Sequence, residues 1–234
     1  MNLHLFSDPG ERIVNVLEAS RPHLEGKDEP VVAYLPLASL YAERWQEENE
    51  RAFKGLAHLE TVNAELMTQK QIEDVIRRAA LVYIPGGNTF LLNHRLHASG
   101  ILPYLKKKIQ AGLPLVGFSA GTVVCGQDIL TSKDMNTVAT PHFEGLRLVP
   151  FNFFAHYADD SQGQSLHDEW LGDYHIFHDH PVILMGNGAY VKVDGKKTTL
   201  VRGNAWILQK DSEKEKLVEG GAIVPDGVPR NEPN

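Results

Sequence analysis

The chain has 234 residues, of which 42% are hydrophobic, and its 30 acidic and 23 basic side chains give a formal net charge of −7 at pH 7. This length suits one domain with a sizeable core. The acidic balance argues against binding to nucleic acid, which needs a basic face, and no apolar run is long enough to cross a membrane. We therefore expect no nucleic-acid partner and no membrane association.

A single cysteine, Cys125, excludes an internal disulfide and fits a reducing compartment. The start of the chain lacks the basic segment of a signal peptide, so the expected localisation is cytoplasmic. No repeat or linker divides the sequence. We therefore expect one domain over residues 1–234, with a frayed tail at residues 225–234.

Apolar strands and helices alternate through the first half of the sequence. Strands are expected at residues 3–6, 31–36, 59–66, 80–84 and 114–118. Helices are expected between them at residues 8–20, 40–56, 69–79, 89–97 and 102–111, with a turn-rich link at residues 22–29. This alternation indicates an α/β fold with a mostly parallel, doubly wound sheet up to about residue 126.

The pattern changes after this point. Asp194-Gly195 separates two β-type runs, which is typical of a hairpin turn, and residues 205–208 form another expected strand. The sequence therefore predicts C-terminal β-hairpins beside the parallel sheet.

The run from Pro114 to Val124 ends an apolar strand in Gly-Phe-Ser-Ala-Gly and continues into a helix-compatible segment. A serine on such a sharp turn presents its Oγ at the carboxyl edge of the sheet, where α/β proteins bind ligands. Flanking glycines let neighbouring backbones pass closely. Ser119 is therefore a candidate nucleophile, and the amide of Ala120, at the start of the helix, is a candidate oxyanion donor.

A serine nucleophile needs a general base within hydrogen-bond reach. Among the 11 histidines, His156 follows an apolar run that would carry its imidazole out of a buried strand to the edge of the sheet. A purely structural histidine is the alternative. The last histidine is His180, and none lies in the C-terminal hairpins. This order argues against an α/β-hydrolase, because that fold keeps its acid and its histidine late in the chain.

Several segments, in order, resemble the peptidase E family of aspartyl dipeptidases. Residues 84–90 (Ile-Pro-Gly-Gly-Asn-Thr-Phe) resemble its Gly-Gly-Gly-Asn-Thr-Phe loop, and residues 117–121 resemble its Gly-Trp-Ser-Ala-Gly turn. Residues 133–135 resemble Asn-Asp-Met, and residues 143–157 resemble the run that ends in Asn-Pro-His-Phe. The resemblance extends to about Trp206. It implies a three-layer α/β/α sandwich, flavodoxin-like, as in the class I glutamine amidotransferases.

The resemblance implies that Ser119 is the nucleophile and His156 the general base. Amides near Gly86 or Gly87, together with Ala120, would form the oxyanion hole, and glycine suits that place because no Cβ blocks the substrate carbonyl. The implied substrate is a small peptide, and neither a cofactor nor a metal is expected. Without the resemblance, the glycines could equally form a plain turn or a phosphate cradle.

The sequence departs from the family at the third triad position. Where the family has a glutamate, residues 184–190 (Leu-Met-Gly-Asn-Gly-Ala-Tyr) carry Asn187. An amide oxygen can fix the imidazole tautomer, but it cannot stabilise the imidazolium by charge. Either Asn187 orients the histidine in a slow enzyme, or an acid assists, and Asp134, Asp159 and Asp160 are the candidates.

The second departure concerns specificity. The aspartyl dipeptidases carry an arginine after the histidine that pairs with the substrate's aspartate, and Leu166 occupies the matching position. No Lys or Arg occurs from residue 148 to 191, and the loop expected after His156 carries six carboxylates: Asp159, Asp160, Asp168, Glu169, Asp173 and Asp179. We expect Asn88, Asp159, Asp160 and Leu166 to contact substrate, and the acidic rim to disfavour aspartyl substrates. The alternative is that these carboxylates only solvate a surface loop.

Residues 175–180 (His-Ile-Phe-His-Asp-His) allow a metal interpretation, because His178 and His180 share a face in an extended segment. No second cluster has ligand spacing, so we expect a polar loop and no metal. A glutaminase is disfavoured because amidotransferases use cysteine at the turn, and Cys125 lies beyond it as a small buried hydrophobe.

The resulting hypothesis is a serine peptidase-type hydrolase of small peptides, dipeptidase-like but not strictly specific for aspartate. It would act as a monomer or a homodimer. Two alternatives stay open: a cyanophycinase-like hydrolase of aspartyl–arginine links, and a catalytically silent binding or regulatory protein of the same fold.

Overall fold

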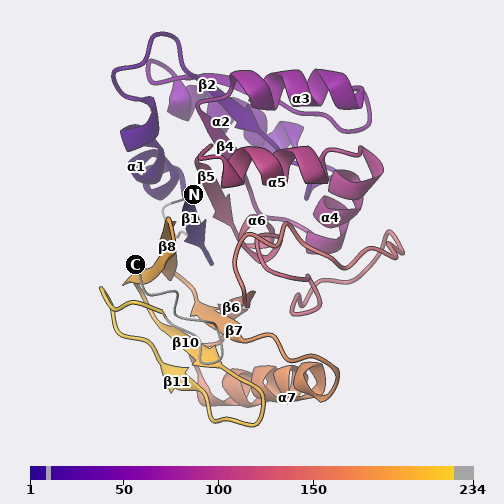
Figure 1. Cartoon of the computed structure of the whole chain (residues 1–234), viewed down its shortest axis with the longest axis vertical. Helices are drawn as coiled ribbons and strands as arrows, with labels where there is room; N and C mark the ends of the chain where they lie inside the picture. The colour runs from indigo at the N-terminus through magenta and orange to yellow at the C-terminus, as the bar shows by residue number, and fades with distance from the viewer. Residues whose placement is uncertain (9–11, 224–234) are drawn as a thin grey trace, which may run out of the picture.

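The central sheet has seven strands in the order β3-β2-β4-β5-β1-β8-β9 in the computed structural model, which describes residues 1–8 and 12–223 (Figure 1). The strands are β1 (Asn2–Phe6), β2 (Val31–Tyr34), β3 (His58–Thr61), β4 (Leu81–Ile84), β5 (Leu115–Phe118), β8 (Tyr190–Asp194) and β9 (Lys197–Arg202). Strands β1 to β5 are parallel, whereas β8 is antiparallel to β1 and β9 is antiparallel to β8. The predicted mostly parallel sheet and the C-terminal hairpin are confirmed.

Helices cover both faces of this sheet. They are α1 (Arg12–Leu24) and α2 (Glu43–Phe53) on one face, and α3 (Gln69–Arg78), α4 (Thr89–Ala98), α5 (Leu102–Gln110) and the short α6 (Ala120–Val123) on the other. Alternate residues of β1 point to the two layers: Leu3 and Leu5 join the core under α3 to α6, whereas Phe6 packs in the cluster with Val16 and Phe53. This is the predicted three-layer arrangement.

Four further strands form a second sheet, which lies at the bottom of Figure 1. They are β6 (Asn152–Tyr157), β7 (Val182–Gly186), β10 (Ala205–Leu208) and β11 (Glu215–Lys216), in the order β11-β10-β7-β6. The parallel strands β6 and β7 are joined through α7 (Ser161–Phe177), and Leu171 of this helix packs on Phe154 and Leu184. Phe153 and Ile183, on the other face, extend the main core.

The loop expected across residues 159–179 is wrong, because most of it is helix α7. The buried positions of α7 are His167, Leu171, Tyr174 and His175, which have helical spacing. Two of the four are histidines, so the stripe does not read as apolar. Helix α1 also continues through Pro22 to Leu24, since a proline this close to a helix end removes one hydrogen bond and leaves little helix to disturb.

Two sequence predictions lie outside the described residues: the frayed tail at 225–234 and the Pro9 side of the first helix. The single domain over residues 1–234 remains a prediction. Within the described part of the chain, no helix combines the length and the apolar character needed to cross a bilayer.

His4 occupies a buried polar cluster on the α1 side of the sheet. This residue is 4% exposed, with its Nδ1 2.5 Å from Tyr190 Oη and its Nε2 2.9 Å from His23 Nε2. Burial, followed by the nearby His23, lowers the pKa of His4 from 6.5 to about 4. The folded state therefore disfavours the charged ring.

This depressed pKa predicts a loss of stability in acid. The contribution of neutral His4 is present above pH 6.5 and is lost as the pH falls toward about 4, because only the unfolded chain takes up the proton in that range. Urea unfolding at pH 7.0 and pH 4.5 should show that His4→Gln removes up to about 3 kcal/mol of the wild-type pH dependence. An identical pH dependence in wild type and His4→Gln would contradict the assignment.

Candidate active site

Ser119 lies at the turn between β5 and α6, as the sequence predicts. Its backbone has φ 51° and ψ −115°, a conformation that costs an L-residue on the order of 1–3 kcal/mol. The Ser119 N–H donates to the carbonyl oxygens of Phe6 (2.9 Å) and Ser7 (3.1 Å), at the end of β1. A Cβ on Gly121 would lie 2.1 Å from the Ile84 carbonyl oxygen, so only glycine lets the chain pass β4 here.

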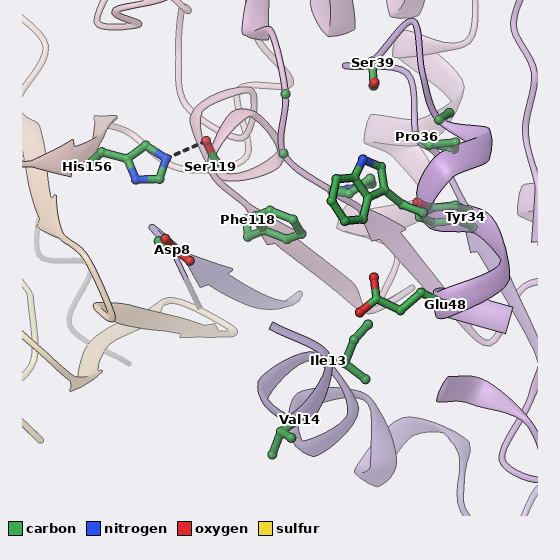
Figure 2. Close-up of a pocket in the computed structure, with 15 residues that line it drawn as sticks. Asp8, Ile13, Val14, Tyr34, Pro36, Ser39, Glu48, Phe118, Ser119 and His156 are labelled. Atoms are coloured by element: carbon green, nitrogen blue, oxygen red, sulfur yellow. Dashed lines mark hydrogen bonds between the residues drawn. The ribbon is translucent and has the colours of Figure 1, made fainter. Parts of the chain in front are cut away.

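A chain of hydrogen bonds links three side chains that are far apart in sequence. The Ser119 Oγ lies 2.9 Å from His156 Nε2 (Figure 2), and His156 Nδ1 lies 2.9 Å from Asn187 Oδ1. His156 is half-buried at a bulge in β6, with φ 57°, and Asn187 is exposed just after β7. The structure thus brings together the predicted nucleophile, the predicted base and the amide at the third position.

The orientation of the Asn187 side chain determines which ring nitrogen of His156 carries a proton. Its Oδ1 is an acceptor only, so His156 Nδ1 must carry the proton that it donates. Nε2 of the neutral ring is then free to accept the Ser119 hydroxyl proton. This is the tautomer that a general base for Ser119 requires.

Ser7 is a part of the site that the sequence analysis missed. It is fully buried after β1; its hydroxyl donates to the Met185 carbonyl oxygen (2.9 Å) and accepts the His156 N–H (2.8 Å). On the other side, Lys133 Nζ donates to the His156 carbonyl oxygen (3.0 Å). The unusual backbone of His156 is therefore held by contacts from two other segments. The only sequence feature that indicates this role is the presence of a small polar residue, Ser7, directly after the first strand.

Removal of the Ser7 hydroxyl should disturb the imidazole more than the fold. In Ser7→Ala the His156 N–H loses its partner, at a cost of about 1–3 kcal/mol in stability. Displacement of the ring should lower kcat on the order of 10²-fold, with a smaller change in KM. Ser20→Ala is the matched control, because Ser20 is equally buried and its hydroxyl donates to Val16 within α1. Equal kcat values for the two variants would show that Ser7 does not position His156.

A glycine loop passes directly beside the nucleophile. A Cβ on Gly86 would lie 3.0 Å from the Ser119 Cβ and 2.8 Å from the Phe118 ring. Gly87 has φ 140°, and a Cβ there would lie 2.4 Å from the Ala38 carbonyl oxygen. Neither position has room for a side chain: the backbone of Gly86 packs directly against Ser119 and Phe118, and that of Gly87 packs against Ala38.

A cavity of about 730 Å³ opens beside Ser119. Figure 2 shows His156 on one side of Ser119, with Tyr34, Pro36 and Glu48 on the other, while Ile13 and Val14 lie below them. The cavity wall thus comes largely from α1, α2 and the segment after β2. These residues cannot be recognised as part of a site from the sequence, because they resemble ordinary core or surface positions and only the sheet order brings them to Ser119.

The model of peptidase family S51 matches residues 5–201 of the chain. The chain belongs to peptidase family S51. This is a family of serine-type peptidases, and the resemblance to peptidase E is confirmed.

Curated relatives carry the names of this family. A Drosophila melanogaster protein named "Probable alpha-aspartyl dipeptidase" is 37% identical over 158 residues, or 65% of this chain and 66% of the fly protein. The "Peptidase E" of Streptomyces coelicolor is 35% identical over 126 residues, or 52% of each chain. That of Shewanella amazonensis is 29% identical over 181 residues, or 76% of this chain and 77% of its own. The matched stretches therefore span only part of each relative.

A solved structure supports the fold. The crystal structure of a peptidase from an acI-B1 Actinobacterium has a TM-score of 0.69 at 19% identity, and the alignment covers 95% of this chain and 96% of that one.

Asp134, one of the acids that the sequence suggested as a partner of His156, contacts other residues in this S51 chain. Its Oδ2 accepts the Thr89 N–H (2.7 Å) and the Ser132 hydroxyl (3.0 Å), whereas His156 Nδ1 faces Asn187. Asn88 caps the same helix by accepting the Leu91 N–H (2.9 Å), and it donates to the Met135 carbonyl oxygen (2.9 Å). Asp134 and Asn88 therefore tie the 132–135 segment to the start of α4, directly after the glycine loop.

Two residues predicted to contact substrate, Asp160 and Leu166, belong to helix α7 and its N-terminal cap. Asp160 caps α7 by accepting the Gly163 N–H (2.8 Å), and Leu166 is 46% exposed on this helix instead of in a loop. Among the described residues that line the cavity, neither of these nor Asp159 occurs. One carboxylate of the expected acidic rim, Asp168, is paired with a cation, because Lys214, which follows β10, lies 2.5 Å from it. Residues 148–191 contain no Lys or Arg, but Lys133 and Lys214, from segments before and after them, contact this part of the chain.

The histidine-rich segment is part of the packing around α7. His175 is buried in the helix, and the His178 ring stacks on Tyr174 with centroids 4.7 Å apart. Over residues 1–8 and 12–223, no group of three or more His, Cys, Asp or Glu side chains could hold a metal ion. Cys125 is fully buried, as expected, and burial raises the pKa of its thiol.

Proposed function

We propose that this chain is a serine peptidase that hydrolyses short peptides, dipeptides among them, with Ser119 as nucleophile and His156 as general base. The observation that carries the proposal is the 2.9 Å contact between Ser119 Oγ and His156 Nε2, with the serine in a strained turn. Membership of family S51 supports the reaction type.

In the proposed reaction, His156 Nε2 takes the hydroxyl proton as Ser119 Oγ attacks the scissile carbonyl. The resulting imidazolium then gives this proton to the leaving amine, and an acyl-enzyme remains on Ser119. Water, deprotonated by the same ring, attacks the ester and releases the acid. Each step thus needs one proton carrier, and His156 serves all of them.

The oxyanion of the tetrahedral intermediate needs preorganised donors. We assign this role to the Ala120 amide, at the start of α6, and to an amide of the Gly86–Gly87 loop. The close approach of Gly86 to the Ser119 Cβ supports the assignment, because a donor must lie about 3 Å from the developing charge.

Asn187 is proposed as the residue that orients His156. An amide selects the tautomer without adding negative charge, so the imidazolium is less stabilised than beside a carboxylate. We therefore expect a slower enzyme than a relative with an acid at this position.

Two measurements test the proposal together. A fluorophosphonate probe should label wild-type protein at Ser119, and peptide mapping should find the adduct there and not on Ser7 or Ser132. A library of unprotected dipeptides, followed by quantification of released amino acids, should show turnover that the probe abolishes. A catalytically silent homologue would show neither labelling nor turnover, and that outcome would refute the proposed function.

A further inference from the structure

The residue after Asn187 is a glycine, and this pair is the only Asn-Gly step in the sequence. The backbone nitrogen of a residue that follows asparagine can attack the asparagine side-chain amide, because a five-membered ring closes between them. A side chain on the following residue hinders the attack, and glycine has none. The other asparagines inside the chain precede Leu, Val, Glu, Ala, Thr, His or Phe, so ring closure is sterically easiest at Asn187.

The local structure presents this step to solvent. Asn187 is exposed in the turn between β7 and β8, and Gly188 has φ 80°. The Gly188 N–H donates to the Asp8 carbonyl oxygen (2.8 Å), so this backbone hydrogen bond must open before the nitrogen can attack. A hydrogen bond at an exposed turn opens far more often than the core unfolds. The reaction is therefore accessible to the folded protein.

The His156 imidazole binds the oxygen of the same side-chain amide. Its Nδ1–H donates to Asn187 Oδ1 (2.9 Å). When the Gly188 nitrogen attacks Asn187 Cγ, negative charge develops on this Oδ1, and the imidazole N–H is already in position to stabilise it. The hydrogen bond that orients the general base therefore also favours attack on the asparagine side chain.

We propose that Asn187 is a self-deamidation site, and that its conversion to aspartate places a carboxylate beside His156 Nδ1 and activates the enzyme. Aspartate has the size of asparagine and keeps an acceptor oxygen for the imidazole N–H. It adds the negative charge that stabilises the imidazolium during the reaction. The proposal rests on the proposed function, since it concerns the residue that orients His156 in that mechanism.

The reaction balances with water as the co-reactant. The Gly188 nitrogen bonds to Asn187 Cγ and gives its proton to solvent, while the Cγ–Nδ2 bond breaks and Nδ2 takes up a proton and leaves as ammonia. Water then opens the cyclic imide at one of its carbonyl carbons. Opening at Cγ gives aspartate with a normal backbone. Opening at the main-chain carbonyl gives isoaspartate, whose longer backbone moves the carboxylate away from His156 Nδ1.

The test follows purified wild-type protein during incubation in mildly alkaline buffer. Released ammonia is quantified, peptide mapping locates the change of mass, and anion exchange separates the products, since each carries an additional negative charge. A synthetic peptide of residues 184–190 gives the rate without the fold. We expect conversion at Asn187 in the native protein. The kcat of the aspartate form should match that of Asn187→Asp and exceed that of the unconverted form about 10-fold or more, whereas the isoaspartate form should be slower than the unconverted one.

Two glycine substitutions separate attack at Asn187 from general unfolding. Gly188 and Gly220 have φ 80° and 76°, and among the described residues nothing lies within 4 Å of a Cβ at either position. Gly188→Ala and Gly220→Ala therefore introduce similar backbone strain, but only the first adds a methyl group to the attacking residue. Gly188→Ala should convert several-fold more slowly than Gly220→Ala.

The outcomes separate this proposal from the proposed function. Conversion of the peptide without conversion of the native protein would overturn the self-deamidation site. Equal conversion rates in the two alanine variants, or an aspartate form no more active than the unconverted one, would overturn the proposal as well. Conversion at Asn187 with no Ser119-dependent dipeptide hydrolysis in any form would overturn the proposed function and leave the modification site in place.

Discussion

Ser119→Ala should reduce kcat for dipeptide hydrolysis on the order of 10⁴-fold or more, because no covalent intermediate can form without the hydroxyl. KM should change little, since the cavity wall stays intact. The measurement is release of the leaving amino acid under saturating substrate, with enough enzyme to detect very slow turnover. Alanine is also an L-residue, so the strained backbone at φ 51° persists and stability should stay close to that of the wild type.

Ser132 provides a matched control for this substitution. It is half-buried like Ser119, and its hydroxyl donates to Asp134 (3.0 Å) and not to His156. Ser132→Ala should retain most of the wild-type kcat. Turnover in Ser119→Ala within a few-fold of wild type would show that another residue performs the reaction.

Substitutions of Asn187 should change kcat in opposite directions. Asn187→Ala removes the acceptor that fixes the His156 tautomer, and we expect kcat to fall on the order of 10²-fold. Asn187→Asp keeps the size and adds a negative charge beside Nδ1, which stabilises the imidazolium and should raise kcat.

The substitution Asp134→Ala tests whether Asn187 or Asp134 is the residue that orients His156. Asp134 accepts the Thr89 N–H at the start of α4, so its removal should cost about 1 kcal/mol of stability with little change in kcat. Loss of activity in Asp134→Ala together with full activity in Asn187→Ala would reverse the roles of the two residues.

Local sequence patterns predicted the first half of the fold and the three linked side chains. The strand before Ser119 and the helix after it lie within a few residues, so the turn can be recognised from neighbours alone. His156 and Asn187 were found through motifs that keep their order in the chain. In each case the signal was contained in a short segment, which is why it could be read without the structure.

The other features of the fold and the site could not be predicted, because most of them depend on contacts between residues that are far apart in the sequence. Ser7 acts on a residue 149 positions away, and Lys214 pairs with a residue 46 positions before it, so no local window contains either pair. Helix α7 was missed because two histidines occupy its buried stripe. The cavity wall includes residues of α1 and α2, such as Ile13 and Trp45, whose role cannot be recognised from the sequence, because only the position of β2 in the sheet brings them close to Ser119.

The central place of β1 also affects how the chain folds. This strand pairs with β5 and β8, whose residues follow it by more than a hundred positions, and its end holds the backbones of Ser119 and His156. During synthesis the first strand must therefore wait until β8 has left the ribosome before its pairing is complete. Such distant pairing carries a high entropic cost of loop closure and slows folding. The end of β1 also holds the backbones of Ser119 and His156, so this pair can form only after β6 has been synthesised and has packed against the first strand.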